Sequence, residues 1–362
     1  MPGPQSSVLR KELNRSRVMA ATSVKLAEIQ PAAKTVRVLH VIPGEDSPNN
    51  FIFARRQVES LQNAGVGIET FFLKSRTSPV AVFKEWARLR KKVRAFAPAI
   101  LHSQYGTVTA ALCGMACNLP LVVTFRGSDL NPIPSIHPVR AMLGHMFSQL
   151  AALRASHLIC VTPQMQQRLW WGRGRASVLS GGVNLKLFYP RSRENTRTLL
   201  GWPLRQAVVL FNAGKEPQIK RLDLAERAVE AARKMYGEFR FEVMRGDISP
   251  DRVPLYMNAA DCLLVTSDYE GSPYIVKEAI ACNLPVVSVD AGDIRQQLEP
   301  VAPSRIVSSR DAEELGRAVT EILRLQQRSN GWEHIQQFSQ EREAGKIVAI
   351  YEQLLGNGSG RK

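Results

Sequence analysis

Two carboxylates flank a predicted helix start in the stretch SDYEGSPYIVKE. The apolar run before it, DCLLV, predicts a buried strand of a parallel sheet. Ser272 suits the N-cap and Pro273 the first helical position, so Glu270 falls in the loop after the strand and Glu278 on the helix. Strand ends and helix N-termini of open α/β sheets bind phosphates and sugars. The two glutamates are therefore either ligand contacts or a loop and a helix carboxylate with no shared task.

Two lysines, Lys215 and Lys220, lie five residues apart between the apolar run VVLFNAG and a predicted helix. Cations in such a place can stabilise negative charge that develops on a bound group, without reacting themselves. The helix start at Ser272–Tyr274 adds backbone N–H donors and a partial positive charge. The alternative for the lysines is a solvated loop, and their position after a strand is the feature that favours a binding role.

Short apolar strands alternate with helices along the whole chain, which predicts doubly wound parallel sheets. In the first half we expect strands in TVRVLHVIPG, VGIETFFL, AILHSQYG, PLVVTFRGSD and ASHLICVT. The pattern restarts after residue 200 with AVVLFNAG, FRFEVMRGD, DCLLVTS and PVVSVDAG. The predicted fold class is therefore α/β, with two Rossmann-like domains and an interdomain cleft.

An internal repeat supports two similar domains. ACNLPLVV and ACNLPVVS each follow a helix and open a strand, and Asn118 and Asn283 can end those helices in the left-handed conformation. Neither G-x-G-x-x-G nor G-x-x-x-x-G-K-[ST] occurs, which disfavours dinucleotide oxidoreductases and P-loop enzymes. The predicted boundaries are a flexible tail over 1–34, a first Rossmann-like domain over 35–190, a second Rossmann-like domain over 191–335, a helix over 336–356 that could pack back on the first domain, and a tail over 357–362.

The composition is that of a globular protein of a reducing compartment. All five cysteines lie in apolar helix or strand contexts without a C-x-x-C pair, which predicts buried, reduced thiols. The six histidines are scattered, so we expect no metal site. No signal peptide is recognisable, and the longest apolar stretch, residues 110–125, contains glycine, asparagine and proline. We expect a soluble, cytoplasmic protein.

The formal charge of +16 predicts an acidic partner, a negatively charged surface, or only a basic proteome. Residues 83–96 hold six Lys or Arg against one Glu beside an apolar stripe at helical spacing, and residues 154–205 hold nine against one acid. Either the first segment is an ordinary domain helix with Trp86 in the core, or its basic face meets anionic lipid headgroups. The basic face would consist of Lys84, Arg88, Lys91, Lys92 and Arg94.

Five segments, in order along the chain, resemble the GT-B glycosyltransferases of family 4, the retaining group that uses nucleotide-sugar donors. The resemblance runs from about residue 35 to residue 356. The segments are TFRGSD, similar to the family's T-x-H-G-x-D loop; GGVNLKLFYP, similar to the segment leading into the second domain; AGKEPQIKRLDLAERAV, similar to the G-R…K-G stretch; EGSPYIVKE, similar to the E-x7-E signature; and EAIACNLPVVSVDAG, similar to the segment directly after that signature.

The resemblance implies that the domain over 35–190 is the acceptor domain and that the domain over 191–335 is the nucleotide-sugar domain. It also implies a role for each candidate residue. Lys215 and Lys220 would stabilise the leaving diphosphate, Glu270 would face the sugar, and Glu278 would accept hydrogen bonds from the ribose hydroxyls. No metal or other cofactor is implied, because the lysines supply the positive charge. The donor site would comprise Gly214, Lys215, Lys220, Gly271, Ser272, Pro273, Tyr274 and Glu278, and the acceptor side Gly44, His102, Arg126 and Asp129.

The chain departs from the family pattern at several positions. Lys215 stands where arginine is usual, which keeps the charge but loses the bidentate fork. Arg126 replaces a histidine, and only Gly44 remains of a usual glycine pair. His102 is either a satisfied residue at the core edge or a cleft residue. Asp129 either caps the following segment or binds an acceptor hydroxyl, and the second reading is favoured.

The predicted function is retaining transfer of a hexose from a nucleotide-diphosphate sugar to a lipid-linked or polysaccharide acceptor. A UDP-sugar is favoured over a GDP-sugar, and peripheral association with the cytoplasmic face of a membrane is expected. The alternatives are a non-enzymatic basic protein that binds membranes or nucleic acid, and another GT-B enzyme such as a sugar-nucleotide epimerase. No nucleic-acid partner is expected, because the basic stretches lack interleaved aromatics and recognised binding motifs.

Overall fold

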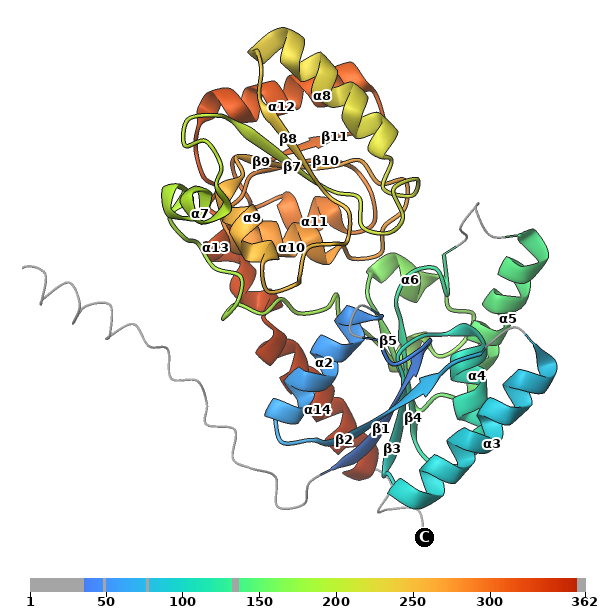
Figure 1. Cartoon of the computed structure of the whole chain (residues 1–362). Coiled ribbons are helices and arrows are strands. Elements are labelled where there is room, and N and C mark those ends of the chain that lie inside the picture. Colours follow the sequence, from blue (N-terminus) through green and yellow to red (C-terminus); the bar gives the residue numbers. More distant parts are fainter. Residues whose placement is uncertain (1–35, 48–49, 76–77, 132–136, 357–362) are drawn as a thin grey trace, which may run out of the picture. The chain divides into compact units, whose positions relative to one another are not determined.

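Two parallel β-sheets with helices on both faces form the described part of the chain (Figure 1). The computed structural model describes residues 36–47, 50–75, 78–131 and 137–356. The tails predicted over 1–34 and 357–362 lie outside the described residues. We call the part built on the first sheet the N-terminal lobe and the part built on the second sheet the C-terminal lobe.

The N-terminal lobe contains a six-stranded sheet in the order β2-β1-β3-β4-β5-β6, with every pair parallel. Its strands are β1 Arg37–Pro43, β2 Gly67–Leu73, β3 Ile100–Ser103, β4 Leu121–Phe125, β5 His157–Cys160 and β6 Ala176–Val178. Its helices are α2 Ile52–Asn63, α3 Pro79–Phe96, α4 Thr107–Ala116, α5 Pro138–Arg154 and α6 Pro163–Gln167, with a 3₁₀ turn, η1, at Arg173–Arg175.

The C-terminal lobe contains a five-stranded parallel sheet in the order β11-β10-β9-β7-β8. Its strands are β7 Val208–Asn212, β8 Arg240–Met244, β9 Cys262–Val265, β10 Val286–Val289 and β11 Arg305–Val307. Its helices are α7 Arg193–Leu200, α8 Leu222–Tyr236, α9 Val253–Ala259, α10 Tyr274–Ala281, α11 Ile294–Leu298, α12 Ala312–Leu325 and α13 Gly331–Ile335. The chain then continues through the 3₁₀ turn η2, Gln336–Phe338, to the last helix, α14 Gln340–Gly356.

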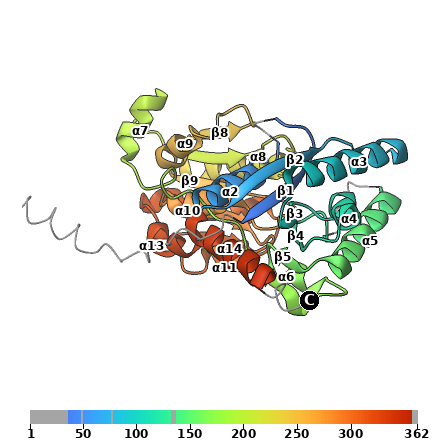
Figure 2. The ribbon, with the colours of Figure 1, turned by 90° about the horizontal axis from the view of Figure 1, so that it is seen from below.

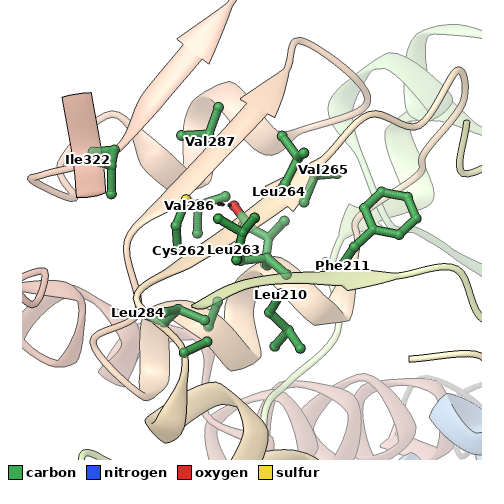
Figure 3. Packing of buried hydrophobic residues seen from close by; sticks show 14 of the residues in the cluster. Leu210, Phe211, Cys262, Leu263, Leu264, Val265, Leu284, Val286, Val287 and Ile322 are labelled. Atoms are coloured by element: carbon green, nitrogen blue, oxygen red, sulfur yellow. Dashed lines mark hydrogen bonds between the residues drawn. The ribbon is translucent and has the colours of Figure 1, made fainter. Parts of the chain in front are cut away.

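The two sheets are wound in the same way. Read from its other edge, the second sheet runs β8-β7-β9-β10-β11, which repeats the order of β2-β1-β3-β4-β5 in the first. This is a doubly wound topology, and it confirms the α/β class with two Rossmann-like sheets. The central strands β7, β9 and β10 are buried on both faces, so Leu210, Leu263 and Val286 pack into one continuous core (Figure 3).

The ends of the two repeated segments differ. Asn283 has a φ of 55°, and its side-chain oxygen accepts the N–H of Trp332 at 2.6 Å, so the predicted left-handed turn is confirmed there. Asn118 is not among the described residues with positive φ, and Cys117, the residue after α4, has an extended conformation. The prediction for Asn118 was wrong because the chain leaves α4 by straightening instead of turning.

Helices cover the two faces of the first sheet in two groups. Alternate strand residues such as Leu39 and Val123 pack with α3, α4 and α5, whereas Val38 and Val122 face the other side. That second side is covered by α2 and by α14, although α14 comes from the far end of the chain (Figure 1 and Figure 2). The last helix therefore completes the core of the N-terminal lobe.

A polar network crosses this core. The hydroxyl of Tyr351 on α14 lies 2.6 Å from Nδ1 of His102 and 3.2 Å from Nε2 of His40. The other ring nitrogen of His102 lies 2.7 Å from Oγ1 of Thr124. Both histidines are fully buried, and burial lowers the pKa of His40 to about 3 and that of His102 well below its ordinary value.

Because of these two buried histidines, we expect the folded state to lose stability in acid. Their pKa values are lower in the folded chain, so the unfolded chain binds more protons below pH 6.5 and the folded state loses stability as the pH falls from there toward 3. His40 alone should lower the free energy of unfolding by about 2 kcal/mol between pH 7 and pH 5. Urea unfolding at the two values measures this loss. The loss should shrink in His40→Gln but persist in His137→Gln, an exposed control, and equal losses in both variants would contradict the assignment.

Candidate active site

Two of the charged groups predicted to act on the donor meet in the C-terminal lobe. Nζ of Lys220 lies 2.6 Å from Oε1 of Glu270, and the side chains are 25% and 10% exposed. Lys220 precedes α8 and Glu270 follows β9, so the pair lies at the carboxyl ends of the strands. The hydroxyl of Thr266 donates to the carbonyl of Lys220 at 2.8 Å, which fixes one loop against the other.

Lys215 lies on the same loop as Lys220 but is exposed. The N–H groups of Ala213 and Gly214 both reach the carbonyl of Met244, at 3.0 and 3.2 Å, so the loop is anchored to the end of β8. Gly214 has a φ of 53°, a conformation that favours glycine. The structure thus presents the two predicted lysines from one anchored loop, Lys220 paired with a carboxylate and Lys215 facing solvent.

The start of α10 differs from the prediction. The helix begins at Tyr274, Pro273 is its cap residue, and no side chain caps it. The hydroxyl of Ser272 instead donates to Oδ2 of Asp293 at 2.7 Å and accepts from Nζ of Lys277 at 2.7 Å. The N-cap role of Ser272 was therefore wrong, because two buried charged groups are stronger hydrogen-bond partners than a backbone N–H.

Glycines bring three loops of this region into close contact. A Cβ on Gly271 would lie 2.8 Å from the carbonyl oxygen of Arg126, and one on Gly292 would lie 2.2 Å from the carbonyl oxygen of Gly271. Neither position has room for a side chain. The loop that carries Glu270 is thereby held by its backbone against the turn after β10.

Lys277 is a charged residue of this region that the sequence interpretation missed. It is fully buried, and its ammonium group donates to the carbonyl groups of Ser180 and Gly181, to the latter at 3.1 Å. Burial lowers its pKa to about 8, opposed by the nearby carboxylate of Asp293. A signal was present in the sequence, because a lysine inside the apolar helix YIVKEAIA must find partners when it is buried.

Glu278 is buried and holds an ion pair with a residue of the N-terminal lobe. Its Oε1 accepts from Nη1 of Arg56 on α2 at 2.7 Å, with the two side chains 8% and 19% exposed. Burial raises the pKa of Glu278, and the charge of Arg56 opposes that rise. Arg56 is a further residue of the site that no motif indicated, since its partner lies 222 residues away in the chain.

Arg126 contacts several polar and aromatic side chains. Its guanidinium donates to the side-chain oxygens of Gln57 at 3.2 Å and of Gln104, and reaches the hydroxyl of Tyr274 at 3.5 Å. The same group lies over the ring of Phe53, 4.8 Å from its centroid. Arg126 therefore contacts Tyr274, a residue predicted for the donor site.

Two residues predicted on the acceptor side are structural instead. His102 is fully buried with both ring nitrogens bonded, so it is the satisfied core residue. Asp129 is also buried, and its carboxylate accepts the N–H groups of Gly106 and Gly127 at 2.9 Å and of Arg126 at 3.0 Å. Its prediction as an acceptor ligand was wrong, because three backbone donors already occupy the carboxylate.

The remaining acceptor-side residue, Gly44, lies in the turn after β1. Its φ is 99°, and its N–H donates to the carbonyl of Leu73 at 2.9 Å. The side chain of Asn50 closes the turn by donating to the carbonyl of Glu45 at 2.8 Å. Gly44 therefore shapes this strand end through its backbone.

The described residues also bear on thiols, metals and membrane spans. All five cysteines are free, and all are buried except Cys117, which is partly exposed. Among the residues placed by the structure, no group of three His, Cys, Asp or Glu could hold a metal ion. Within the same residues, no helix has the length and apolarity needed to cross a bilayer.

Comparison with known proteins identifies the family. Residues 38–187 match the family described as Glycosyltransferase Family 4, and residues 243–340 match Glycosyl transferases group 1. The chain is a GT-B glycosyltransferase of family 4. The predicted family, fold and enzyme class are confirmed.

Relatives of this family 4 glycosyltransferase come from several sources. A Bacillus subtilis glycosyltransferase named for teichuronic acid biosynthesis, TuaC, is 22% identical over 349 residues, which cover 79% of this chain and 88% of TuaC. A D-inositol 3-phosphate glycosyltransferase of Mycobacterium marinum is 26% identical over 219 residues, 51% of this chain and 46% of that protein. Anabaena HepE, solved with UDP and glucose, has the same fold, with a TM-score of 0.67 and 14% identity over 88% of this chain and 99% of HepE.

Proposed function

We propose that this family 4 glycosyltransferase moves a hexose from a UDP-hexose, with retention of configuration, to a lipid-linked or polysaccharide acceptor. The observation that carries the proposal is the 2.6 Å pair of Lys220 and Glu270 at the carboxyl ends of the strands. Glu278 and the start of α10 follow in the same segment of the chain. Cationic and carboxylate groups are thus brought together where an open α/β sheet binds its ligand.

The proposed reaction replaces one bond at the anomeric carbon by another on the same face of the sugar. The bond to the diphosphate oxygen breaks, the acceptor oxygen forms the new bond, and the acceptor proton passes to the leaving diphosphate. Lys215 and Lys220 stabilise the charge that grows on that diphosphate. Glu270 holds the Lys220 ammonium in place and faces the sugar. Glu278 accepts hydrogen bonds from the ribose hydroxyls. Because two lysines supply positive charge, we propose that no metal takes part.

The donor base is proposed to be uridine. The similar fold of HepE, which was solved with UDP and glucose, supports this choice. A thermal-shift panel of UDP, GDP and ADP tests it directly. UDP at a hundred times its dissociation constant should raise the free energy of unfolding by about 2.7 kcal/mol. Equal shifts with all three nucleotides would contradict a uridine site, and a larger shift with GDP would reassign the donor.

The acceptor is proposed to be lipid-linked or polymeric. TuaC, which is named for teichuronic acid biosynthesis, supports this proposal over most of its length. The inositol phosphate enzyme of Mycobacterium marinum supports a small acceptor instead, over less than half of its own length. Radiolabelled transfer from UDP-glucose and UDP-galactose to a lipid extract and to inositol phosphate separates the two classes.

The second part of the proposal is peripheral association with a membrane. The sequence predicted that the basic face of α3 would make this contact. Trp86 is partly buried against the core, and its indole N–H donates to the carbonyl of Met115 at 3.3 Å. Arg88 pairs with Glu85, and Lys92 pairs with Glu69. Trp86 therefore fits the alternative in which it packs on the core, and not the one in which it anchors α3 at a membrane interface. The basic face of α3 contributes charge to the proposed association.

A further inference from the structure

Helix α5 has its apolar face turned outward. Its buried residues are small or polar, namely Ser148, Gln149, Ala151 and Ala152. Its exposed stripe is Val139, Met142, Leu143, Met146, Leu150 and Leu153, each between 45% and 57% exposed. These positions follow helical spacing and share one face. A surface helix of a globular protein normally has the opposite arrangement, and a continuous exposed apolar stripe indicates an interaction surface.

Two tryptophans extend this stripe. Trp170 and Trp171 are 55% and 43% exposed, and their rings lie 5.7 Å apart. The ring of Trp170 also lies 5.3 Å from that of His145 on α5. The buried side chain of Gln149 holds Trp170 there, since its oxygen accepts the N–H of Trp170 at 2.9 Å and its amide donates to the carbonyl of Arg168 at 3.0 Å. Trp170 is therefore fixed beside α5 although it is exposed, and the ring of Trp171 packs edge-on against it.

The charged residues in this part of the sequence are all basic. Residues 130–193 contain eight Lys or Arg and no Asp or Glu. Arg140 and Arg154 on α5 and Arg168 and Arg173 beside the tryptophans are exposed. Amphipathic helices that lie in a membrane surface combine an apolar face with basic residues and tryptophan. A second copy of the chain would instead bring the same positive charge to the contact.

We propose that the α5 stripe with Trp170 and Trp171, here called the α5 face, docks onto a bilayer that contains anionic lipids. This inference rests on the membrane association proposed above and assigns it to a surface. A groove of about 1520 Å³ runs along α5 and is lined by Met142, Leu143 and Phe147, and by Ser128 and Asp129 at the end of β4. Docking by the α5 face places that groove beside the lipid, where a lipid-linked acceptor would enter it.

The experiment is vesicle sedimentation with the full chain and two matched pairs of substitutions. Leu150→Glu with Leu153→Glu alters the α5 face, and Leu199→Glu with Leu204→Glu makes the same change at exposed leucines of the C-terminal lobe. With phosphatidylglycerol vesicles at low salt, the α5 pair should lower partitioning by at least about tenfold, through lost apolar contact and added negative charge. The control pair should change it by less than about twofold.

A second measurement keeps the test independent of those variants. Brominated lipid should quench the tryptophan fluorescence of the wild-type chain, and Trp170→Phe with Trp171→Phe should abolish most of that quenching. Unchanged urea midpoints establish that the variants fold. Neutral vesicles or high salt should release the protein.

Three outcomes overturn the proposal in distinguishable ways. If Lys91→Glu with Lys92→Glu abolishes binding while the α5 pair leaves it intact, α3 is the docking surface and membrane association stands. If neither the wild-type chain nor any variant binds anionic vesicles, the proposals of membrane association and of the α5 face are both wrong. UDP binding still tests the proposed donor site, because that measurement does not depend on membranes. If sedimentation velocity shows a dimer that the α5 pair dissociates, a second copy covers the face instead.

Discussion

Replacing Lys215 and Lys220 together by alanine is expected to lower kcat by about a thousandfold. The diphosphate gains charge as the sugar leaves, and the two lysines present cations from one anchored loop at the strand ends. Groups that stabilise charge only in the transition state affect turnover more than substrate affinity. The measurement is steady-state release of UDP with saturating donor.

The control is Lys234→Ala, which removes an exposed lysine from α8 in the same lobe. It should leave kcat unchanged within a factor of about two. Loss of Lys220 also leaves the carboxylate of Glu270 without its partner, so the free energy of unfolding should fall by about 1–2 kcal/mol. A folded double variant that turns over at the wild-type rate would remove both lysines from the mechanism.

Replacing Glu278 by alanine is expected to raise the dissociation constant of UDP by about ten- to a hundredfold. The ribose hydroxyls lose a charged acceptor, which contributes about 1.5–3 kcal/mol. The substitution also leaves Arg56 partly buried without its carboxylate, so stability should fall as well. Titration calorimetry with UDP measures the affinity, and urea unfolding measures the stability.

The double variant Glu278→Ala with Arg56→Ala separates the two effects. It removes the unpaired charge and should regain stability, while UDP binding stays weak because the ribose acceptor is still missing. Recovery of wild-type affinity in the double variant would mean that Glu278 acts on binding only by neutralising Arg56. An unchanged dissociation constant in the single variant would exclude Glu278 from the ribose site.

The fold could be predicted because it depends on local patterns. The apolar strands of the C-terminal lobe are buried on both faces, so the run DCLLV identifies β9 without further context. Strands β6 and β11 were missed, because three residues are too few to show a period. The exposed stripe of α5 was also missed, because apolar residues at helical spacing are ordinarily assigned to a core.

The site could be predicted only where its partners are close in sequence or share a motif. Glu270 and the two lysines follow strands, so their place at the sheet edge follows from topology. The roles of His102 and Asp129 depend on which atoms surround them. His102 is satisfied by Tyr351, 249 residues away, and Asp129 by backbone N–H groups that the folded loop turns inward. No local pattern contains such information.

The origin of Tyr351 also bears on how the protein is synthesised. Domains ordinarily fold as units while the chain leaves the ribosome, N-terminal domain first. Here Ala344, Ile347 and Tyr351 belong to the core of the first sheet, whose last strand ends at Val178. At ordinary translation rates those residues emerge roughly ten to thirty seconds after that strand. During this interval Val38, Ile100 and Val122 lack part of their cover, so we expect the nascent N-terminal lobe to expose apolar surface to chaperones until α14 emerges.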